Sequence, residues 1–444
     1  MKQTENTFFA ENIQTAIRQG KTGRSMLIFA ALIIMLITGA CSGVGQNQPG
    51  GTRTRIPSTP EKPAASPMVS GAPETSQKEV FKSGLNLSAT DKNYTGENSS
   101  SCPPFLYRYD ERRTGRSVNS IPKKPKVIYK IKAEGKINAA ASLMPDGGIV
   151  FGTLGGKLYI INKDGSFRKK LTLESWIYSS PAVAPDGTIY TACDNGDVVC
   201  LSPKGDIKWT SQVPAETSSS PLLLGSKLFL GSEANMLHAL TTGGKEIWNF
   251  PTKQRILFSS PSADKSGNLY IGAEDNILYQ VKSDGTAGWK FKAKGEISLS
   301  SPVVTPEGNI VFASSDKQIY CVSPKGKQIW QFTTHEETAG SPALAEDGSV
   351  YAAAFDGVLI CLNKNGKLKW KRKIADGNQT SPTVDAKGNI IVACKRGIVA
   401  VDSKGKTLWN LKNFGGPLAS DVVLTNSNCA VTGGDDQYLY FIGD

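Results

Sequence analysis

Residues 179–209 read SSPAVAPDGTIYTACDNGDVVCLSPKGDIKW. Short runs of β-forming residues alternate here with Asp-Gly, Asn-Gly and Lys-Gly turns, and the last run ends at Trp209. Asp-Gly and Asn-Gly between such runs are the strongest short-range signal for a β-hairpin. The stretch therefore predicts four short antiparallel strands in succession, forming one small sheet.

The same pattern recurs about every 40 residues to the end of the chain. A proline opens six of the copies, and a tryptophan marks the last strand of six. Two degenerate copies carry Ala141 and Asp421 in the place of the proline, which makes eight copies in all. A four-stranded unit repeated at this period is typical of a β-propeller. The prolines are Pro181, Pro221, Pro261, Pro302, Pro342 and Pro382, and the tryptophans are Trp209, Trp248, Trp289, Trp330, Trp370 and Trp409.

The last copy lacks a fourth strand, because the sequence ends at Asp444 directly after its third. The missing strand has a counterpart near the start of the repeats, where Tyr129 precedes Ala141 as Trp209 precedes Pro221. We therefore predict that residues 126–132 pair with the last copy and close the ring, which removes the exposed sheet edges. The predicted fold is all-β, an eight-bladed propeller of four-stranded antiparallel blades over residues 125–444.

Residues 1–40 have the features of an export signal. Arg18, Lys21 and Arg24 precede an apolar run over 26–37, which is shorter than the roughly 20 residues of a membrane-spanning helix. The following Thr-Gly-Ala-Cys41 resembles the lipobox of bacterial lipoproteins, although that family usually has Leu where Thr38 stands. The resemblance implies acylation of Cys41 and a membrane-anchored lipoprotein facing the periplasm or the cell surface. Ordinary signal cleavage and an uncleaved short anchor are the alternatives.

The composition changes between the signal and the repeats. Residues 41–101 are rich in Pro, Gly, Ser and Thr, so they bury too little apolar surface to fold and are predicted to form a disordered tether. Residues 102–124 are predicted to be a basic linker. Between 102 and 134 nine basic residues face three acidic ones, half of the chain's net charge of +12. This segment either contacts anionic headgroups or an acidic partner, or is an exposed, solubilising linker.

The string Gly-Lys-x-x-Trp links the repeats to a known family. It occurs at 244–248, 326–330, 366–370 and 405–409, and it resembles the PQQ-type (quinoprotein-like) repeat. That repeat builds the eight-bladed quinoprotein dehydrogenases and the outer-membrane assembly lipoproteins of the BamB group, which the lipobox-like start makes the nearer likeness. The resemblance implies a tryptophan that docks against the neighbouring blade, and either a protein-binding scaffold or a quinone- and calcium-dependent dehydrogenase.

The residues favour the scaffold over the enzyme. The family's dehydrogenases carry long insertions and an adjacent cysteine pair, whereas every repeat here is close to 40 residues long and no Cys-Cys pair occurs. We therefore expect no catalytic residues, no metal and no cofactor. The acidic residues Asp275, Asp316 and Asp356 recur in one turn of each repeat, and turn chemistry accounts for them. No nucleic-acid motif occurs. The repeat phase of Cys193 and Cys200 predicts free, buried thiols.

A binding surface is expected where the sequence departs from the repeat. In such blades the turns between second and third strands and the loops between blades lie on one face. The loops 173–179, 253–259, 334–340 and 375–380 vary most, and they carry side chains typical of protein contacts. We predict a protein partner at the cell envelope for a monomeric chain; inward packing of Tyr178 and Phe258 as a plug of the channel, and binding of cell-wall glycan, are the alternatives. The candidate residues are Trp176, Tyr178, Arg255, Ile256, Leu257, Phe258 and His335.

Overall fold

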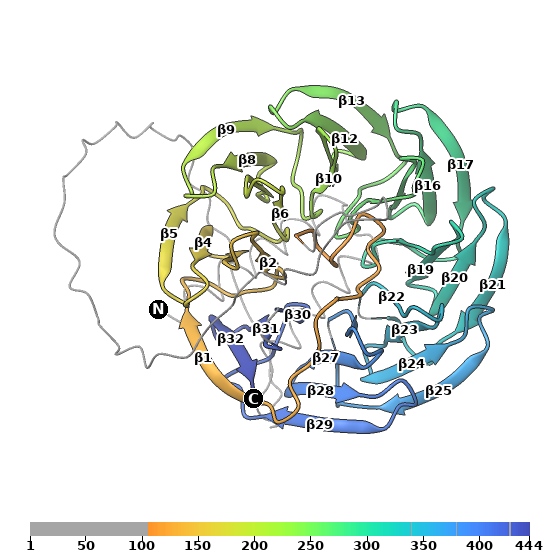
Figure 1. Ribbon diagram of the computed structural model, residues 1–444. Coiled ribbons are helices and arrows are strands. Elements are labelled where there is room, and N and C mark those ends of the chain that lie inside the picture. Colours follow the sequence, from red (N-terminus) through yellow and green to blue (C-terminus); the bar gives the residue numbers. More distant parts are fainter. Residues whose placement is uncertain (1–104, 339, 379, 426–427) are drawn as a thin grey trace, which may run out of the picture. The chain divides into compact units, whose positions relative to one another are not determined.

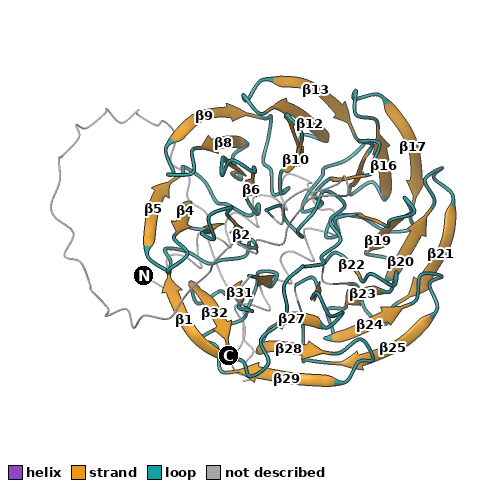
Figure 2. Ribbon diagram, in the orientation of Figure 1, coloured by secondary structure: helices purple, strands orange, loops and turns teal. Residues whose placement is uncertain are grey.

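Eight four-stranded antiparallel sheets lie around a ring in the computed structural model (Figure 1), which describes residues 105–338, 340–378, 380–425 and 428–444. Every regular element of these residues is a strand (Figure 2). None of them forms a helix of the length and apolar character needed to cross a membrane. The prediction of an all-β, eight-bladed propeller is confirmed.

Each blade runs from an inner two- or three-residue strand to a longer outer strand. Blade 1 contains β2 (Ser142–Leu143), β3 (Ile149–Gly152), β4 (Lys157–Ile161) and β5 (Phe167–Thr172). Blade 2 contains β6 (Ala182–Val183), β7 (Ile189–Ala192), β8 (Asp197–Leu201) and β9 (Ile207–Gln212). Blade 3 contains β10 (Leu222–Leu224), β11 (Lys227–Ser232), β12 (Met236–Thr241) and β13 (Glu246–Pro251). Blade 4 contains β14 (Ser262–Ala263), β15 (Leu269–Gly272), β16 (Ile277–Val281) and β17 (Ala287–Lys292).

The second half of the ring repeats this order. Blade 5 contains β18 (Val303–Val304), β19 (Ile310–Ser314), β20 (Gln318–Val322) and β21 (Gln328–Thr333). Blade 6 contains β22 (Ala343–Leu344), β23 (Val350–Ala353), β24 (Val358–Leu362) and β25 (Leu368–Lys373). Blade 7 contains β26 (Thr383–Val384), β27 (Ile390–Cys394), β28 (Gly397–Val401) and β29 (Thr407–Lys412). Blade 8 contains β30 (Val423–Leu424), β31 (Ala430–Gly433), β32 (Tyr438–Gly443) and the first strand of the ring, β1 (Lys126–Lys132).

Blade 8 is completed from the other end of the repeat array. Strand β1 pairs antiparallel with β32, and Ile131 lies opposite Leu439. Tyr129 takes the place that a tryptophan holds elsewhere, and its hydroxyl donates to the carbonyl oxygen of Gly165 in blade 1 (3.5 Å). The predicted closure by residues 126–132 is therefore confirmed: β32 is paired on both sides, and blade 8 has four strands like the others.

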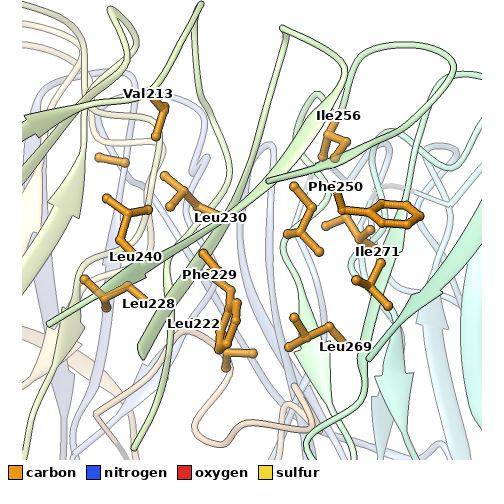
Figure 3. Close-up of a cluster of buried hydrophobic side chains, with 14 of the residues drawn as sticks. Val213, Leu222, Leu228, Phe229, Leu230, Leu240, Phe250, Ile256, Leu269 and Ile271 are labelled. Atoms are coloured by element: carbon orange, nitrogen blue, oxygen red, sulfur yellow. The ribbon is translucent and has the colours of Figure 1, made fainter. Parts of the chain in front are cut away.

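The hydrophobic core lies between the blades. The second and third strands of each blade are buried along most of their length, whereas the outer strands alternate between exposed and half-buried residues. This follows from stacking: a strand covered on both faces reads as a continuous apolar run, while a strand at the rim faces water on one side. Between blades 3 and 4, for example, Leu230, Phe250 and Ile271 belong to one buried cluster (Figure 3).

Contacts between adjacent blades explain why tryptophan and glycine recur at a regular spacing in the repeats. Gly244, at φ 85°, lies over the ring of Trp209 so closely that a Cβ there would be 2.8 Å from the indole. The Trp209 indole N–H donates to the carbonyl of Thr242 in the next blade (3.1 Å). Trp289, Trp330 and Trp370 form the equivalent bond to the next blade, and Trp409 donates to the carbonyl of Pro122, just before β1. Tryptophan docking against the neighbouring blade is thus confirmed.

The serine of the Ser-Pro pair that opens six of the inner strands takes part in a belt of hydrogen bonds from blade to blade. The amide N–H of Ser180 donates to Oγ of Ser220, that of Ser220 to Ser260, and the series continues through Ser301, Ser341 and Ser381 at 2.9–3.1 Å. The belt ends where the Ser381 N–H donates to the Asp421 carboxylate (2.7 Å). Asp421 therefore occupies the serine position of blade 8, and the expected assignment of Asp421 to the proline position was wrong by one residue.

Residues 105–119 lie across the centre of the ring (Figure 1, orange). Inner strands of several blades donate backbone hydrogen bonds to this segment, including Ala263 to Glu111 (2.8 Å), Leu344 to Thr114 (2.9 Å) and Val384 to Gly115 (2.8 Å). We call residues 105–119 the axial segment. The expectation of an exposed basic linker over 102–124 is corrected for 105–119, because this stretch is an integral part of the propeller.

Two arginines of the axial segment are buried at its centre. Arg113 has no exposed surface, and it donates to the carbonyl oxygens of Pro261 (3.0 Å), Ser220 (3.0 Å), Pro221 (3.2 Å) and Tyr107 (2.7 Å). Arg108 donates to the carbonyl of Pro342 (2.5 Å) and lies 3.5 Å from the Asp421 carboxylate. Guanidinium groups thus supply donors to the carbonyls of four of the repeated prolines, Pro221, Pro261, Pro342 and Pro382.

Several predictions concern residues outside the described part of the chain. The signal peptide over 1–40, the acylated Cys41, the tether over 41–101 and residues 102–104 of the linker lie there. The described cysteines are all free and buried, which agrees with the expectation for Cys193 and Cys200: Cys193, Cys200, Cys321, Cys361, Cys394 and Cys429.

Candidate functional site

One face of the propeller is built from the inter-blade loops and the turns between second and third strands, and we call it the loop face. In each blade an amide N–H of that turn donates to a carbonyl of the preceding inter-blade loop. Asp194 donates to Trp176 (2.8 Å), Glu233 to Glu216 (2.8 Å) and Glu274 to Arg255 (3.0 Å), and the other five blades repeat the bond. These turns and loops therefore share one face, as predicted.

Three of the predicted residues form an aromatic cluster on the loop face. The rings of Trp176 and Tyr178 meet edge to face at a centroid distance of 6.0 Å, and Tyr178 meets Phe258 in the same way at 5.7 Å. Trp176 keeps 44% of its surface exposed, while Tyr178 and Phe258 are half-buried. Because their loops are separated by blades 2 and 3, Tyr178 and Phe258 meet by pointing inward. This is the inward packing that the plug alternative expects of these two rings, while the axial segment lies against the inner strands of the blades.

Ile256 does not belong to the exposed surface. It is fully buried, and its Cγ2 lies so close to Gly231 that a Cβ there would be 2.2 Å away. Ile177 makes the same contact with Gly152 in blade 1 (2.3 Å). The prediction of Ile256 as a contact residue was therefore wrong: it packs the loop against the second strand of its blade. Its neighbour Leu257 is half-buried.

His335 lies apart from the aromatic cluster. It belongs to the inter-blade loop between blades 5 and 6, its side chain is 84% exposed, and its Nδ1 lies 3.4 Å from the Asp356 carboxylate. Within the described residues no ring contact or hydrogen bond joins His335 to Trp176, Tyr178 or Phe258. The structure thus brings three of the seven candidates together and leaves His335 separate.

Arg255 links blades 3 and 4 on the loop face. Its Nε and one Nη atom donate to both carboxylate oxygens of Glu274 (2.9 and 3.0 Å), and its other Nη atom donates to Glu233 (2.8 Å). Glu233 lies in a turn of blade 3 and Glu274 in the equivalent turn of blade 4. A bidentate guanidinium-carboxylate pair holds a fixed geometry, so Arg255 positions these turns, and it is still 42% exposed.

Acidic side chains lie beside the Tyr178 hydroxyl and next to one another on the loop face, and we call them the acidic rim. The acidic rim comprises Asp194, Glu216, Glu233 and Glu274. Burial, reinforced by the Glu216 carboxylate, raises the pKa of Asp194 to about 6. Burial also raises the pKa values of Glu233 and Glu274, against the opposing effect of Arg255. Burial and the Asp194 and Glu233 carboxylates together raise the pKa of the Tyr178 hydroxyl. The shift of Tyr178 places the Asp194 and Glu233 carboxyl groups near its hydroxyl.

Replacing Asp194 by Asn should stabilise the fold in a pH-dependent way. The carboxyl ionises near pH 6 in the folded chain and near pH 4 in the unfolded chain, so ionisation costs folding free energy above pH 6. Asp194→Asn should raise the free energy of unfolding by about 1–2 kcal/mol at pH 7.5, after discounting for solvent screening. The gain should shrink between pH 6 and 4 and vanish below pH 4, as measured by urea unfolding at each pH.

Asp164→Asn provides a control of opposite sign. Hydrogen bonds from the Ser166 side chain (2.6 Å) and amide (2.9 Å) lower the pKa of Asp164. Its replacement should reduce stability at neutral pH rather than raise it. A gain for Asp194→Asn that persisted unchanged at pH 3 would contradict the assignment of a buried, charge-coupled carboxyl.

The other acidic turn residues serve the turns themselves. Asp275 accepts from the amides of Ile277 (3.0 Å) and Lys253 (3.1 Å) and from the Tyr279 hydroxyl. Asp316 accepts from the amides of Gln318 and Lys294, both at 3.1 Å. These contacts confirm that turn chemistry accounts for Asp275 and Asp316. No group of three or more His, Cys, Asp or Glu residues among those described is placed to hold a metal ion.

Blade 3 contains a hydrogen-bonded Ser-His-Glu series that the sequence did not reveal. Ser232 Oγ lies 2.9 Å from His238 Nε2, and His238 Nδ1 lies 2.9 Å from the Glu246 carboxylate. These are the contacts of a catalytic triad. Both Ser232 and His238, however, are fully buried, so no substrate carbonyl reaches Ser232 Oγ. The series gives both ring nitrogens of the buried His238 imidazole a hydrogen-bond partner inside the blade.

The described residues at the axis of the ring leave no room for the quinone cofactor of the family's dehydrogenases. At the axis, Leu106, Arg108 and Asp421 line a cavity of about 20 Å³, and Ser300 and Ser314 line a cavity of about 10 Å³ near the loop face. The larger holds about one water molecule, whereas ligand pockets of organic cofactors occupy several hundred Å³. The axial segment and its arginines take up the central volume in which such a ring system would lie.

Comparisons with known proteins agree with the repeat architecture. The family model described as outer membrane protein assembly factor BamB matches residues 172–318 and 315–443, more than half of the chain. The crystal structure of BamB from Moraxella catarrhalis is similar, with a TM-score of 0.63 and 15% identity over 72% of this chain and 100% of that one. A europium-containing methanol dehydrogenase has a TM-score of 0.64 and 12% identity over 77% of this chain and 98% of its own.

No curated protein sequence matches the chain. At 15% and 12% identity the two solved structures share the fold with it and nothing more. The family match has a different weight, because it extends over both halves of the repeat array. The chain belongs to the family of the outer membrane protein assembly factor BamB.

Proposed function

We propose that this chain is a non-catalytic scaffold of the cell envelope, which binds a partner protein through its loop face in outer-membrane protein assembly. The observation that carries the proposal is the aromatic cluster, where an exposed Trp176 is supported edge to face by Tyr178 and Phe258. A large aromatic side chain held on a rigid base is the usual centre of a protein-protein contact. The family membership supports the same role.

The acidic rim indicates which partner chemistry this surface suits. Arg255 already engages Glu233 and Glu274, while Asp194 adds a carboxyl group near Tyr178 and Glu216 adds one near Asp194. A partner segment with an apolar side chain for Trp176 and flanking Lys or Arg side chains would complement this surface. Complementary charge mainly accelerates association and excludes wrong partners. The partner is therefore expected to present a basic, partly apolar surface.

Site-specific photo-crosslinking in intact cells tests the proposal. The photoreactive residue p-benzoylphenylalanine would replace Trp176 in one full-length variant and Phe167 in a control. Phe167 is an aromatic residue with 53% exposure on β5, the outer strand of blade 1. We expect a protein of the outer-membrane assembly machinery to be captured from position 176 and not from 167. Capture of the same proteins from both positions, or of peptidoglycan alone from 176, would contradict the scaffold role.

Membrane attachment through Cys41 completes the proposal. Acyl chains on a cysteine that follows an export signal would hold the propeller at the envelope, and more than one chain is needed for stable anchoring. Replacing Cys41 by Ala should release the chain into the soluble fraction, whereas Ser42→Ala should leave it in the membrane fraction. Retention of the Cys41→Ala chain in the membrane fraction after a salt wash would exclude acylation as the means of attachment.

A further inference from the structure

A pocket of about 380 Å³ lies between blades 6 and 7, on the side of the loop face. It is bounded by the end of β25, the inter-blade loop 374–376, the turn that follows Cys394, and strands β28 and β29. Its volume lies within the range of small-molecule sites. We call it the basic pocket, after its three cationic side chains, Lys373, Arg396 and Lys412.

The pocket lies at a position that a tyrosine side chain fills in some of the other blades. In blades 1, 4 and 8 a tyrosine on the third strand reaches the preceding inter-blade loop, where its hydroxyl accepts from a backbone N–H. Tyr159 accepts from Glu134 (2.8 Å), Tyr279 from Lys253 (3.2 Å) and Tyr440 from Gly415 (3.2 Å). The equivalent residue of blade 7 is Val399, so the volume next to Ala375 stays open.

The turn of blade 7 contributes to the same opening. Only Lys395 and Arg396 separate β27 from β28, whereas four residues separate β7 from β8 in blade 2. The first residue of β28 is Gly397, which adds no side chain to the pocket wall. In blades 4 and 5 this turn contains Asp275 and Asp316, whose carboxylates accept hydrogen bonds from the preceding inter-blade loop. The turn of blade 7 contains two basic residues in their place. A shortened, basic turn beside an unfilled position makes a pocket with positive walls.

The charges of the pocket are not balanced by the protein. The lining contains three basic side chains, Lys373, Arg396 and Lys412, and one acidic side chain, Asp376. Its net charge is therefore 3 − 1 = +2. The Lys373 ammonium donates to the carbonyl of Asp356, and neither Arg396 nor Lys412 forms an ion pair with any described residue. Three cations around one cavity repel each other, and a bound anion relieves that repulsion.

We propose that the basic pocket binds a small phosphate monoester. Such a group carries up to two negative charges near neutral pH and offers three acceptor oxygens, which matches the net charge of the pocket. The guanidinium of Arg396 can bind two of these oxygens at once, and the two ammonium groups act as point charges. The floor, formed by Val399 and the buried Cys394, accommodates the ester carbon. This site lies on other blades than the aromatic cluster and is independent of it.

Calorimetric titration of the full-length chain at low salt tests the proposal. Glycerol 3-phosphate, which has the chemistry of a lipid headgroup, and glucose 6-phosphate, a soluble sugar phosphate, serve as probes, with glycerol as the neutral control. We expect saturable binding of at least one phosphate monoester, no binding of glycerol, and weaker affinity at high salt. The probe that binds more tightly distinguishes a lipid source from a soluble one. Saturation by neither probe would overturn the proposal.

Three variants assign the binding to this pocket. Arg396→Gln should raise the Kd at least about tenfold, because it removes a charge-assisted hydrogen bond. Val399→Tyr restores the side chain found in blades 1, 4 and 8, and it should abolish binding by filling the pocket while the melting temperature is kept. Lys406 is an exposed residue in the turn between β28 and β29 and does not line the pocket. Lys406→Gln should therefore leave the Kd unchanged. Binding that is equally strong in Arg396→Gln and Val399→Tyr would place the ligand elsewhere and refute the site.

Discussion

An Ile131→Asp chain should lose the closure of the ring. Ile131 is 2% exposed and lies opposite Leu439 in the pair of strands that joins the two ends of the propeller. A carboxyl group at this position would be buried in an apolar cluster without a partner, which costs several kcal/mol. We expect a loss of at least about 4 kcal/mol in the free energy of unfolding, measured by guanidinium denaturation followed through tryptophan fluorescence.

The seam should also change its dynamics. When β1 is released, the backbone amides of β32 lose their partners, and hydrogen exchange at 438–443 should accelerate while the interiors of blades 3 to 6 stay protected. Val127→Asp is the matched control, since Val127 is on the same strand but 40% exposed. It should cost less than about 1 kcal/mol. Equal losses for the two variants would show that the seam does not depend on the buried face of β1.

Replacing Arg113 by Met should destabilise the centre of the ring. Methionine keeps much of the apolar volume of the arginine stem but has no donors, so the carbonyls of Pro261, Ser220 and Pro221 lose the guanidinium. Each buried acceptor left unsatisfied costs about 1–3 kcal/mol. We expect a total loss of about 3 kcal/mol or more, visible as a lower denaturation midpoint, with faster hydrogen exchange in residues 105–119.

Arg116→Met is the control for this variant. Arg116 lies on the same chain segment, but its side chain is 37% exposed and its partner Glu346, 4.0 Å away, is 91% exposed. Surface ion pairs of this kind contribute little to stability. The free energy of unfolding should therefore change by less than about 0.5 kcal/mol. If Arg113→Met were as mild as Arg116→Met, the axial segment would not be an integral part of the fold.

The repeats could be predicted from the sequence because each one solves the same local problem. The turn after Asp194 and the tryptophan at 209 recur with the same spacing, and the closure by 126–132 follows from counting strands. The axial segment has no such pattern. Its contacts join residues far apart in the chain, such as Arg113 and Pro261, 148 positions away. From its sequence alone, a charged segment without periodicity resembles a linker. Only the structure shows that backbone carbonyls near the axis accept hydrogen bonds from its arginines.

The candidate site was predictable in part for a related reason. The departure of Trp176, Tyr178 and Phe258 from the repeat singled out these residues, and the structure shows that their rings are in contact. Ile256 was misassigned because its loop places it one position earlier relative to the proline than Ile177, so its packing against Gly231 was hidden. The acidic rim was missed because Asp194 and Asp275 occupy similar turns in the sequence, and only the structure shows that Asp275 serves its turn while Asp194 lies beside Glu216.

The central claim is that this propeller closes its axis with its own chain and offers a binding face in place of a cofactor site. Titration of the full-length chain with pyrroloquinoline quinone in the presence of calcium tests it most directly, read out by calorimetry, by the melting temperature and by dye reduction with an alcohol. The account predicts no saturable heat, an unchanged melting temperature and no quinone-dependent reduction. Stoichiometric quinone binding with a raised melting temperature would contradict it.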